Sequence, residues 1–251
     1  MKHSVYPILG IDIGATTVKF ATLNAAGVLG ERRALPIASQ SNAAFIEQLI
    51  SIVEDAAFSQ CQSVGIGSPG PLDLERGCIL SSANMPQIKN LEVIALLKNK
   101  FPTKIIRLDN DATCATLGQK FFGVAKTWED FAVFTLGTGV GGGAFFHNRL
   151  ERGYKGNFFE VGHIPVDAMR DAGRQCGCGN RGCLEAYASA TGIAFSYKEE
   201  TGVDMSAKDI AARAREGDTH AQAAFSLAAH ALALGAAAIT QTTNITSFIF
   251  T

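Results

Sequence analysis

Two stretches of this sequence share one design: ILGIDIGATTVKFATLNAAGVLG at residues 8–30 and FAVFTLGTGVGGGAFFHNRLERG at residues 131–153. Each consists of an apolar strand, a turn rich in Gly and Thr, a second apolar strand and a polar turn. Short apolar runs bounded by glycine turns predict a β-hairpin. The likeness is one of pattern rather than of identity. Two copies of one hairpin in a single chain predict a duplicated architecture with a cleft between its halves.

The segments around the two hairpins alternate between helical and strand patterns. Apolar residues at helical spacing predict helices over 42–58, 91–101 and 112–123, and further helices near 184–198, 207–216 and 218–241. Short apolar runs predict strands over 63–71 and 103–111, and the last residues, NITSFIFT, begin like a strand. We therefore expect an α/β fold with two domains, residues 1–118 and 119–251.

Composition and charge limit the classes of function. The chain has 251 residues, is 47% hydrophobic and carries 22 basic against 23 acidic residues. Because no basic block stands out, neither a nucleic acid nor a membrane surface is expected as a partner. We find no apolar run near the roughly 18 residues of a membrane span and no signal-peptide cleavage pattern. A cytoplasmic location is the default expectation.

The Gly/Thr turns of the two hairpins are candidate phosphate loops. The first contains Asp12, Gly14, Thr16 and Thr17, and the second contains Gly137, Thr138 and Gly139. Glycine lets backbone N–H groups approach phosphate oxygens, Thr hydroxyls add donors, and an Asp can hold the water shell of Mg²⁺. Lys19 either reaches a phosphate or faces solvent. The second loop matches neither the Walker A pattern nor the dinucleotide fingerprint. Both loops could be plain turns, but their repetition favours binding of phosphate.

The segment LDND at residues 108–111 ends a predicted strand and leads into a helix. Asp111 is then either a helix N-cap, a common role for Asp, or a general base that removes the proton from an attacking hydroxyl. Phosphoryl transfer depends otherwise on positioning and on neutralisation of charge. Sequence periodicity does not separate these two interpretations.

A crowded set of cysteines, CGCGNRGC, predicts a metal site. Cys176, Cys178 and Cys183 have the spacing C-x-C-x₄-C, and His163 precedes them by 13 positions. Three thiolates and one imidazole form a closed tetrahedral set for Zn²⁺, which indicates a structural rather than a catalytic ion. A disulfide is the alternative for the cysteines, and His163 is the less certain fourth ligand from spacing alone.

Taken together, these motifs resemble those of the ROK sugar kinases within the actin-like ATPase superfamily. The matching stretches, in the family's order, are DIGATTVK, GIGSPGPLD, NMP, LDNDATCATLG, TLGTGVGGG, EVGHIPVD and CGCGNRGCLEA. The resemblance implies duplicated domains of the ribonuclease H-like type, a central cleft and a small loop bound to zinc. It also implies phosphorylation of a hexose by ATP.

The resemblance implies a role for each matching residue. Asp111 matches the catalytic base, and the two glycine loops match the ATP phosphate sites. His163 and the three cysteines match the zinc ligands. The residues that match sugar-binding positions are Asn84, Asn110, Asp111, Glu160, His163 and Glu185.

Four features depart from the family pattern. Phe159 stands where glycine usually precedes E-x-G-H, GATT replaces the commoner GGTK, and Gln119 replaces a frequent Glu. Family members also usually continue some 40–70 residues beyond the equivalent of Thr251, with a glycine-rich loop near the adenine. We therefore expect the sugar half of the site to be more complete than the ATP half.

The expected function is phosphorylation of a hexose 6-hydroxyl, with glucose as the first substrate and N-acetylmannosamine, N-acetylglucosamine or fructose as alternatives. A different class is a non-catalytic sugar-binding fragment or a sugar-responsive regulator of the same family. Such regulators carry a DNA-binding segment ahead of the first loop, for which residues 1–11 leave no room. By analogy with the family, we expect a homodimer or a larger homo-oligomer.

Overall fold

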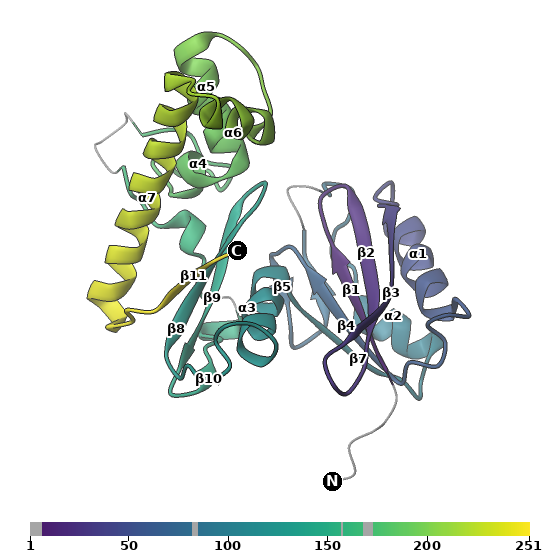
Figure 1. The fold of residues 1–251 in the computed structure, drawn as a ribbon. Helices are drawn as coiled ribbons and strands as arrows, with labels where there is room; N and C mark the ends of the chain where they lie inside the picture. The colour runs from purple at the N-terminus through teal and green to yellow at the C-terminus, as the bar shows by residue number, and fades with distance from the viewer. Residues whose placement is uncertain (1–6, 82–84, 157, 168–172) are drawn as a thin grey trace. The chain divides into compact units, whose positions relative to one another are not determined.

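A computed structural model describes residues 7–81, 85–156, 158–167 and 173–251 of the chain (Figure 1). The chain forms two compact units. The first consists of residues 1–123 with residues 152–157, and the second of residues 124–151 with residues 158–251. The chain thus returns briefly to the first unit before it completes the second.

The first unit is built on a five-stranded sheet in the order β3-β2-β1-β4-β7. These strands are β1 (Ile8–Ile13), β2 (Thr17–Leu23), β3 (Leu29–Pro36), β4 (Ser63–Ser68) and β7 (Ile105–Asn110). The first three are antiparallel neighbours, whereas β4 runs parallel to both β1 and β7. A separate two-stranded sheet joins β5 (Leu72–Asp73) to β6 (Cys78–Ile79).

Alternation along β1 separates a core face from an open face. Leu9, Ile11 and Ile13 are buried, whereas Gly10 and Asp12 lie exposed between them. The buried side chains share one core with α1 (Asn42–Glu54), which Ser41 caps, and with α2 (Val93–Lys100). The third helix, α3 (Asp111–Phe121), follows β7 directly. The open face therefore carries Asp12 at the point where β1 ends.

The second unit repeats the strand order of the first. Its sheet has the order β10-β9-β8-β11, formed by β8 (Phe131–Leu136), β9 (Val140–Phe146), β10 (Arg149–Leu150) and β11 (Phe248–Phe250). As in β1, β2 and β4, the first hairpin is antiparallel and the strand after the helical segment pairs parallel to the first strand. The duplicated α/β architecture predicted from the two hairpins is thus confirmed.

Two 3₁₀ turns, η1 (Tyr154–Gly156) and η2 (Val161–His163), precede the helices of the second unit. These helices are α4 (Glu185–Ala188), α5 (Ala190–Thr201), α6 (Ala207–Arg215) and α7 (Thr219–Thr243). The predicted helix over 184–198 is divided in two, because Ser189 ends α4 and caps α5 through its hydroxyl.

By length and composition alone, α7 could cross a membrane, so the sequence-based statement that no such segment exists was too strict. This is weak evidence for a membrane protein, because core helices of soluble proteins satisfy the same criteria. One side of α7 is buried in the core of the second unit through Ala221, Ala224, Ala228 and Ile239.

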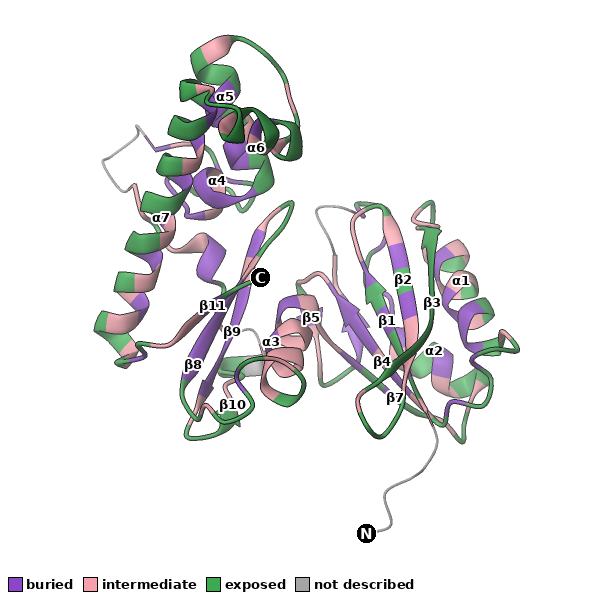
Figure 2. Ribbon diagram, viewed as in Figure 1, coloured by how far each residue is buried: buried purple, intermediate pink, exposed green. Residues whose placement is uncertain are grey.

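Strand β3 was missed from the sequence, as were the two-residue strands β5, β6 and β10. All eight residues of β3 are exposed, and its Glu-Arg-Arg run at 31–33 gives no alternation of apolar and polar residues. Figure 2 shows the contrast between exposed β3 and the buried strands β8 and β9. An edge strand with both faces in water carries none of the period-two signal on which strand prediction relies.

Candidate active site and metal centre

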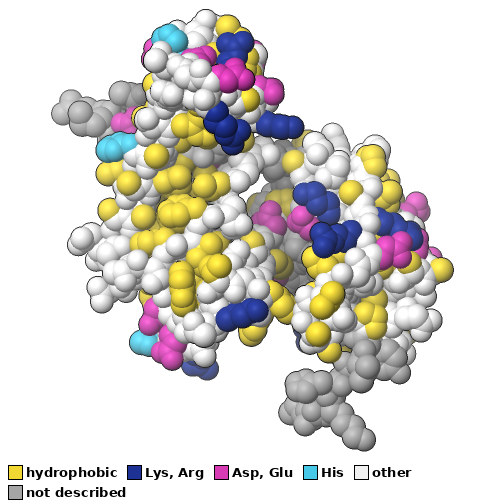
Figure 3. Space-filling model, viewed as in Figure 1, with side chains coloured by type: hydrophobic (Ala, Val, Ile, Leu, Met, Phe, Trp, Pro, Cys, Tyr) yellow, Lys and Arg dark blue, Asp and Glu magenta, His cyan; other side chains and the backbone are white. Residues whose placement is uncertain are grey.

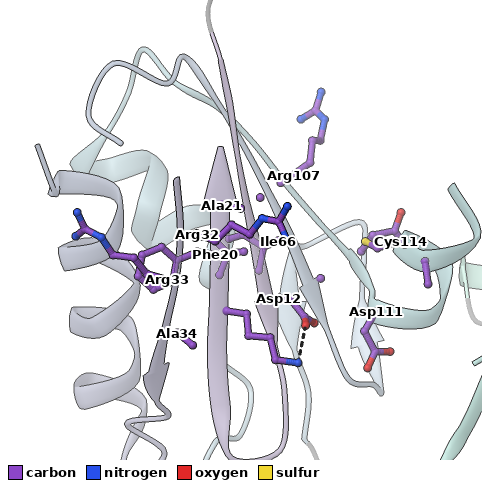
Figure 4. Close-up of a pocket in the computed structure, with 17 residues that line it drawn as sticks. Asp12, Phe20, Ala21, Arg32, Arg33, Ala34, Ile66, Arg107, Asp111 and Cys114 are labelled. Atoms are coloured by element: carbon purple, nitrogen blue, oxygen red, sulfur yellow. Dashed lines mark ion pairs between the residues drawn. The ribbon is translucent and has the colours of Figure 1, made fainter. Parts of the chain in front are cut away.

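A cavity of about 840 Å³ opens on the sheet of the first unit, and its lining includes Asp12, Lys19, Asp109 and Asp111. Figure 4 shows Asp12 at the end of β1 and Asp111 at the start of α3, both on the cavity side of these elements. The fold thus brings together carboxylates that are 99 positions apart in the sequence (111 − 12). Lys19 Nζ lies 4.0 Å from Asp12 Oδ2, and both side chains are more than half exposed, so this pair is weak.

The first glycine turn joins β1 to β2 beside this cavity. The Gly14 N–H donates to the Thr17 carbonyl over 2.9 Å, and the Ile37 N–H donates to the Thr16 carbonyl over 3.0 Å. The turn is therefore held by one backbone hydrogen bond within it and by a second from Ile37, which follows β3. Thr16 is exposed, whereas Gly14 and Thr17 are half-buried.

The helix cap at the start of α3 is Asn110 and not Asp111. Asn110 Oδ1 accepts from the Thr113 N–H over 3.1 Å, with the extended backbone of an N-cap. Asp111 is the first helical residue, and its Oδ1 accepts from the Ala112 N–H over 2.8 Å. Because Asn110 satisfies the capping requirement, Asp111 is not needed for it. The structural alternative for Asp111 loses its main support.

Burial raises the pKa of Asp111 above its usual value, and the negative charge of Asp12 raises it further. The Ala112 N–H opposes this shift by favouring the ionised form. A carboxyl group held in a cavity with a raised pKa is the usual arrangement of a general base or acid.

Sequence reasoning missed an ion pair beside Asp111. Arg152 donates from both terminal nitrogens to Asp109, over 3.0 Å to Oδ1 and 2.6 Å to Oδ2. The Asp109 side chain is only 16% exposed, which makes this pair stronger than the exposed ones. The two residues are 43 positions apart, so no local signal could reveal the contact. The pair fastens residues 152–157 to the end of β7.

Three arginines that were not predicted, Arg32, Arg33 and Arg107, line the same cavity. In Figure 4, the side chains of Arg32 and Arg33 point to opposite sides of β3. The Arg33 side chain pairs with Glu31 and Asp55. Figure 3 shows Lys and Arg side chains gathered near Asp and Glu side chains over the strands of the first unit.

The second glycine turn, residues 137–139, is held by α4 and α5. The Ala190 N–H donates to the Gly137 carbonyl over 2.9 Å, and Thr191 Oγ1 donates to the Thr138 carbonyl over 3.1 Å. Glu185 Oε2 accepts from the Val140 N–H over 2.9 Å. A side chain at Gly139 would meet this carboxylate and would have to displace it.

The predicted zinc ligands come together in the second unit. The ligand atoms of His163, Cys176, Cys178 and Cys183 all lie within 4.8 Å of one another. Cys178 Sγ lies 3.7 Å from Cys183 Sγ, and Cys176 Sγ lies 3.7 Å from His163 Nδ1. Zinc–sulfur bonds of about 2.3 Å in a tetrahedron place two sulfurs about 3.8 Å apart. The donor set and its spacing therefore fit Zn²⁺.

Two thiols of this cluster, Cys176 and Cys183, resist ionisation because burial raises the pKa of each. Burial, together with hydrogen bonds that the Cys183 thiol donates to the Cys178 and Cys176 sulfurs, raises the pKa of Cys183 to about 12. A bound divalent ion removes such protons because it stabilises the thiolates directly.

The other predicted sugar-binding residues differ in their exposure and in whether the structure describes them. Glu160 is exposed just before η2, and Asn110 is half-buried at the cap of α3. Asn84 lies outside the residues that the structure describes. Phe159, which replaces the usual glycine, has a φ of 70° and packs on Phe158 with ring centroids 5.4 Å apart. This left-handed backbone explains physically why glycine suits the position.

A family model, described as the ROK family, matches residues 8–251. The chain belongs to the ROK family. A glucokinase of Thermotoga maritima is 34% identical over 194 residues, which cover 76% of this chain and 60% of the relative. An N-acetyl-D-glucosamine kinase of Vibrio cholerae is 32% identical over 223 residues, which cover 84% of this chain and 72% of the relative.

Solved structures of ROK proteins have the same fold. A ROK family glucokinase from Streptomyces griseus, in complex with glucose and AMPPNP, superposes with a TM-score of 0.83 at 26% identity. That match covers 97% of this chain and 82% of the other. The present chain thus spans about 60% of the length of the T. maritima glucokinase and about four fifths of that of the S. griseus glucokinase.

Proposed function

We propose that this ROK protein transfers the γ-phosphoryl group of ATP to the 6-hydroxyl of a hexose, with glucose as the first substrate. The observation that carries the proposal is the division of roles at the start of α3, where Asn110 caps the helix and Asp111 does not need to. A buried carboxyl with a raised pKa is then left beside a cavity. The resemblance of LDNDATCATLG to the motif that carries the base in ROK kinases supports this role for Asp111.

Asp111 would accept the proton of the attacking hydroxyl as the oxygen–phosphorus bond forms. The phosphoryl group passes to that oxygen, and ADP leaves. The base contributes about 10²–10⁴-fold in rate, and the remainder comes from positioning and neutralisation of charge.

The glycine turns are the proposed phosphate sites, where Gly14, Thr16, Thr17 and Gly137 to Gly139 offer backbone and hydroxyl donors. Asp12 would hold the water shell of Mg²⁺, and Lys19 would bind a phosphate oxygen. Asp12, Lys19 and Asp111 belong to the first unit, whereas Gly137 to Gly139 belong to the second.

The sugar-binding residues are proposed on the same basis. A sugar offers a ring of donor hydroxyls, which suits the carboxylates of Glu160 and Glu185 and the amides of Asn84 and Asn110. His163 would serve both as a zinc ligand and as a wall of the sugar pocket. We also propose a cytoplasmic location and a homodimer or larger homo-oligomer.

N-Acetylglucosamine is the second candidate substrate. Relatives named as N-acetyl-D-glucosamine kinases match 84–85% of this chain, whereas the glucokinases match 74–76%.

An assay of ADP release tests the proposal, with glucose, mannose, fructose and the two N-acetylhexosamines offered in turn. We expect turnover with glucose or N-acetylglucosamine and at least tenfold less with the others. If the protein bound a sugar but released ADP with none of these sugars, the proposed kinase activity would be contradicted. A non-catalytic sugar-binding protein would then be favoured.

A further inference from the structure

Glu185 lies between the cysteine cluster and the second glycine turn, and it contacts both. Its Oε2 accepts from the Val140 N–H over 2.9 Å, and its Oε1 lies 3.8 Å from Cys176 Sγ. The side chain is half-buried. One carboxylate therefore touches a residue of the metal cluster and the backbone of the candidate phosphate loop.

The chain gives Glu185 a second connection to the cluster. Cys183 is two positions earlier, and Glu185 is the first residue of α4. The Leu184 N–H donates to the Ile164 carbonyl over 2.9 Å, next to His163. The predicted metal ligands His163 and Cys183 thus flank this hydrogen bond, and together they fix where α4 begins.

The loop depends in turn on α4 and the start of α5. Beyond the bond from Val140 to Glu185, the Gly137 and Thr138 carbonyls accept from Ala190 and Thr191. The Glu185 carboxylate occupies the space that a side chain at Gly139 would take, so such a side chain would displace it. Displacement of Glu185 would therefore release the loop from one of its anchors and open space beneath it.

We propose that Glu185 is a positioning residue that couples metal occupancy of the cysteine cluster to phosphate binding at the 137–139 loop. The proposal rests on the proposed function, since it takes a nucleotide phosphate as the ligand of the loop. A ligand that orders the loop holds Glu185 and α4 in place, and these hold the cluster residues. Because coupling between two sites is reciprocal in their binding free energies, nucleotide strengthens metal binding by the factor by which metal strengthens nucleotide binding, and slower metal release is the expected sign of that tighter binding.

The test uses the zinc-loaded full chain and follows zinc release to a chromogenic chelator. Release is measured with and without saturating magnesium AMPPNP, and nucleotide affinity is measured by calorimetry in parallel. In the unmodified protein, we expect nucleotide to slow release about 5- to 20-fold, within the usual range for coupled sites.

Two variants at position 185 separate positioning from charge. Glu185→Ala removes the acceptor for Val140 and should reduce the effect of nucleotide to less than twofold. Glu185→Gln keeps an oxygen that accepts from the Val140 N–H, so it should retain at least half of the effect on a logarithmic scale. A second way to displace the carboxylate is Gly139→Ala, which should behave like Glu185→Ala.

Glu200→Ala is the matched control, because it removes an exposed carboxylate of α5 in the same unit. It should retain the full effect of nucleotide on zinc release. Equal zinc release with and without bound nucleotide in the unmodified protein would overturn the coupling, as would an undiminished effect in Glu185→Ala. Failure to bind nucleotide at all would instead overturn the proposed function, and the coupling with it.

Discussion

The Arg152–Asp109 pair gives a stability prediction that the structure makes quantitative. Arg152→Ala removes two hydrogen bonds, of 3.0 and 2.6 Å, from a carboxylate that is only 16% exposed. Exposed ion pairs contribute about 0–1 kcal/mol. A buried charge left without its partner costs about 3–5 kcal/mol.

The Arg152 side chain is 45% exposed, so the pair lies between these limits. We expect Arg152→Ala to lower the free energy of unfolding by about 2 kcal/mol. For a chain of this size that corresponds to a decrease in Tm of about 4–8 °C. Thermal unfolding followed by circular dichroism measures this change.

Arg76→Ala is the matched control, because Arg76 pairs with Glu92 and both side chains are about half exposed. We expect this variant to leave the Tm nearly unchanged. If Arg152→Ala lowered the Tm no more than Arg76→Ala, the inference that the pair fastens residues 152–157 to β7 would be wrong.

Three further predictions concern the metal, the base and Phe159. Metal analysis should find about one zinc per chain, and its removal by a chelator should lower the Tm, because the cluster loop then loses its ligand bonds; a metal-free protein of full stability would refute the metal centre. Because the pKa of Asp111 is raised, the acid limb of kcat/KM should lie above the ordinary Asp pKa of about 3.9. Ionisation of Asp111 in the folded protein lowers the free energy of unfolding as the pH rises from the ordinary to the raised pKa. Asp111→Asn should therefore be more stable than the unmodified protein only above the raised pKa. Phe159→Gly should be more stable in urea than Phe159→Ala by about 1 kcal/mol, since both lose the ring contact and only glycine relieves the positive φ.

The elements marked by strong local signals could be predicted from the sequence. The hairpins that contain Gly14 and Gly139 have apolar strands on both sides of glycine turns, and the structure forms both. The cysteine cluster was equally clear, because its spacing admits few chemistries other than a tetrahedral metal site.

Other features depend on contacts that no local pattern encodes. The edge strand β3 has no buried side to produce alternation. The ion pair between Asp109 and Arg152 exists only once the chain has returned to the first unit. The choice between Asn110 and Asp111 as helix cap depends on whether α3 begins one residue earlier or later, which propensity does not resolve.

The Asp111→Asn variant tests the central claim most directly, in one experiment that measures both sugar affinity and turnover. The substitution keeps the size of the side chain and removes its ability to take a proton. With the sugar that the unmodified protein phosphorylates fastest, we predict a Kd within threefold of the original and a kcat lower by about 10²–10⁴-fold. A variant that retained more than a tenth of the original kcat would contradict the assignment of Asp111 as the base.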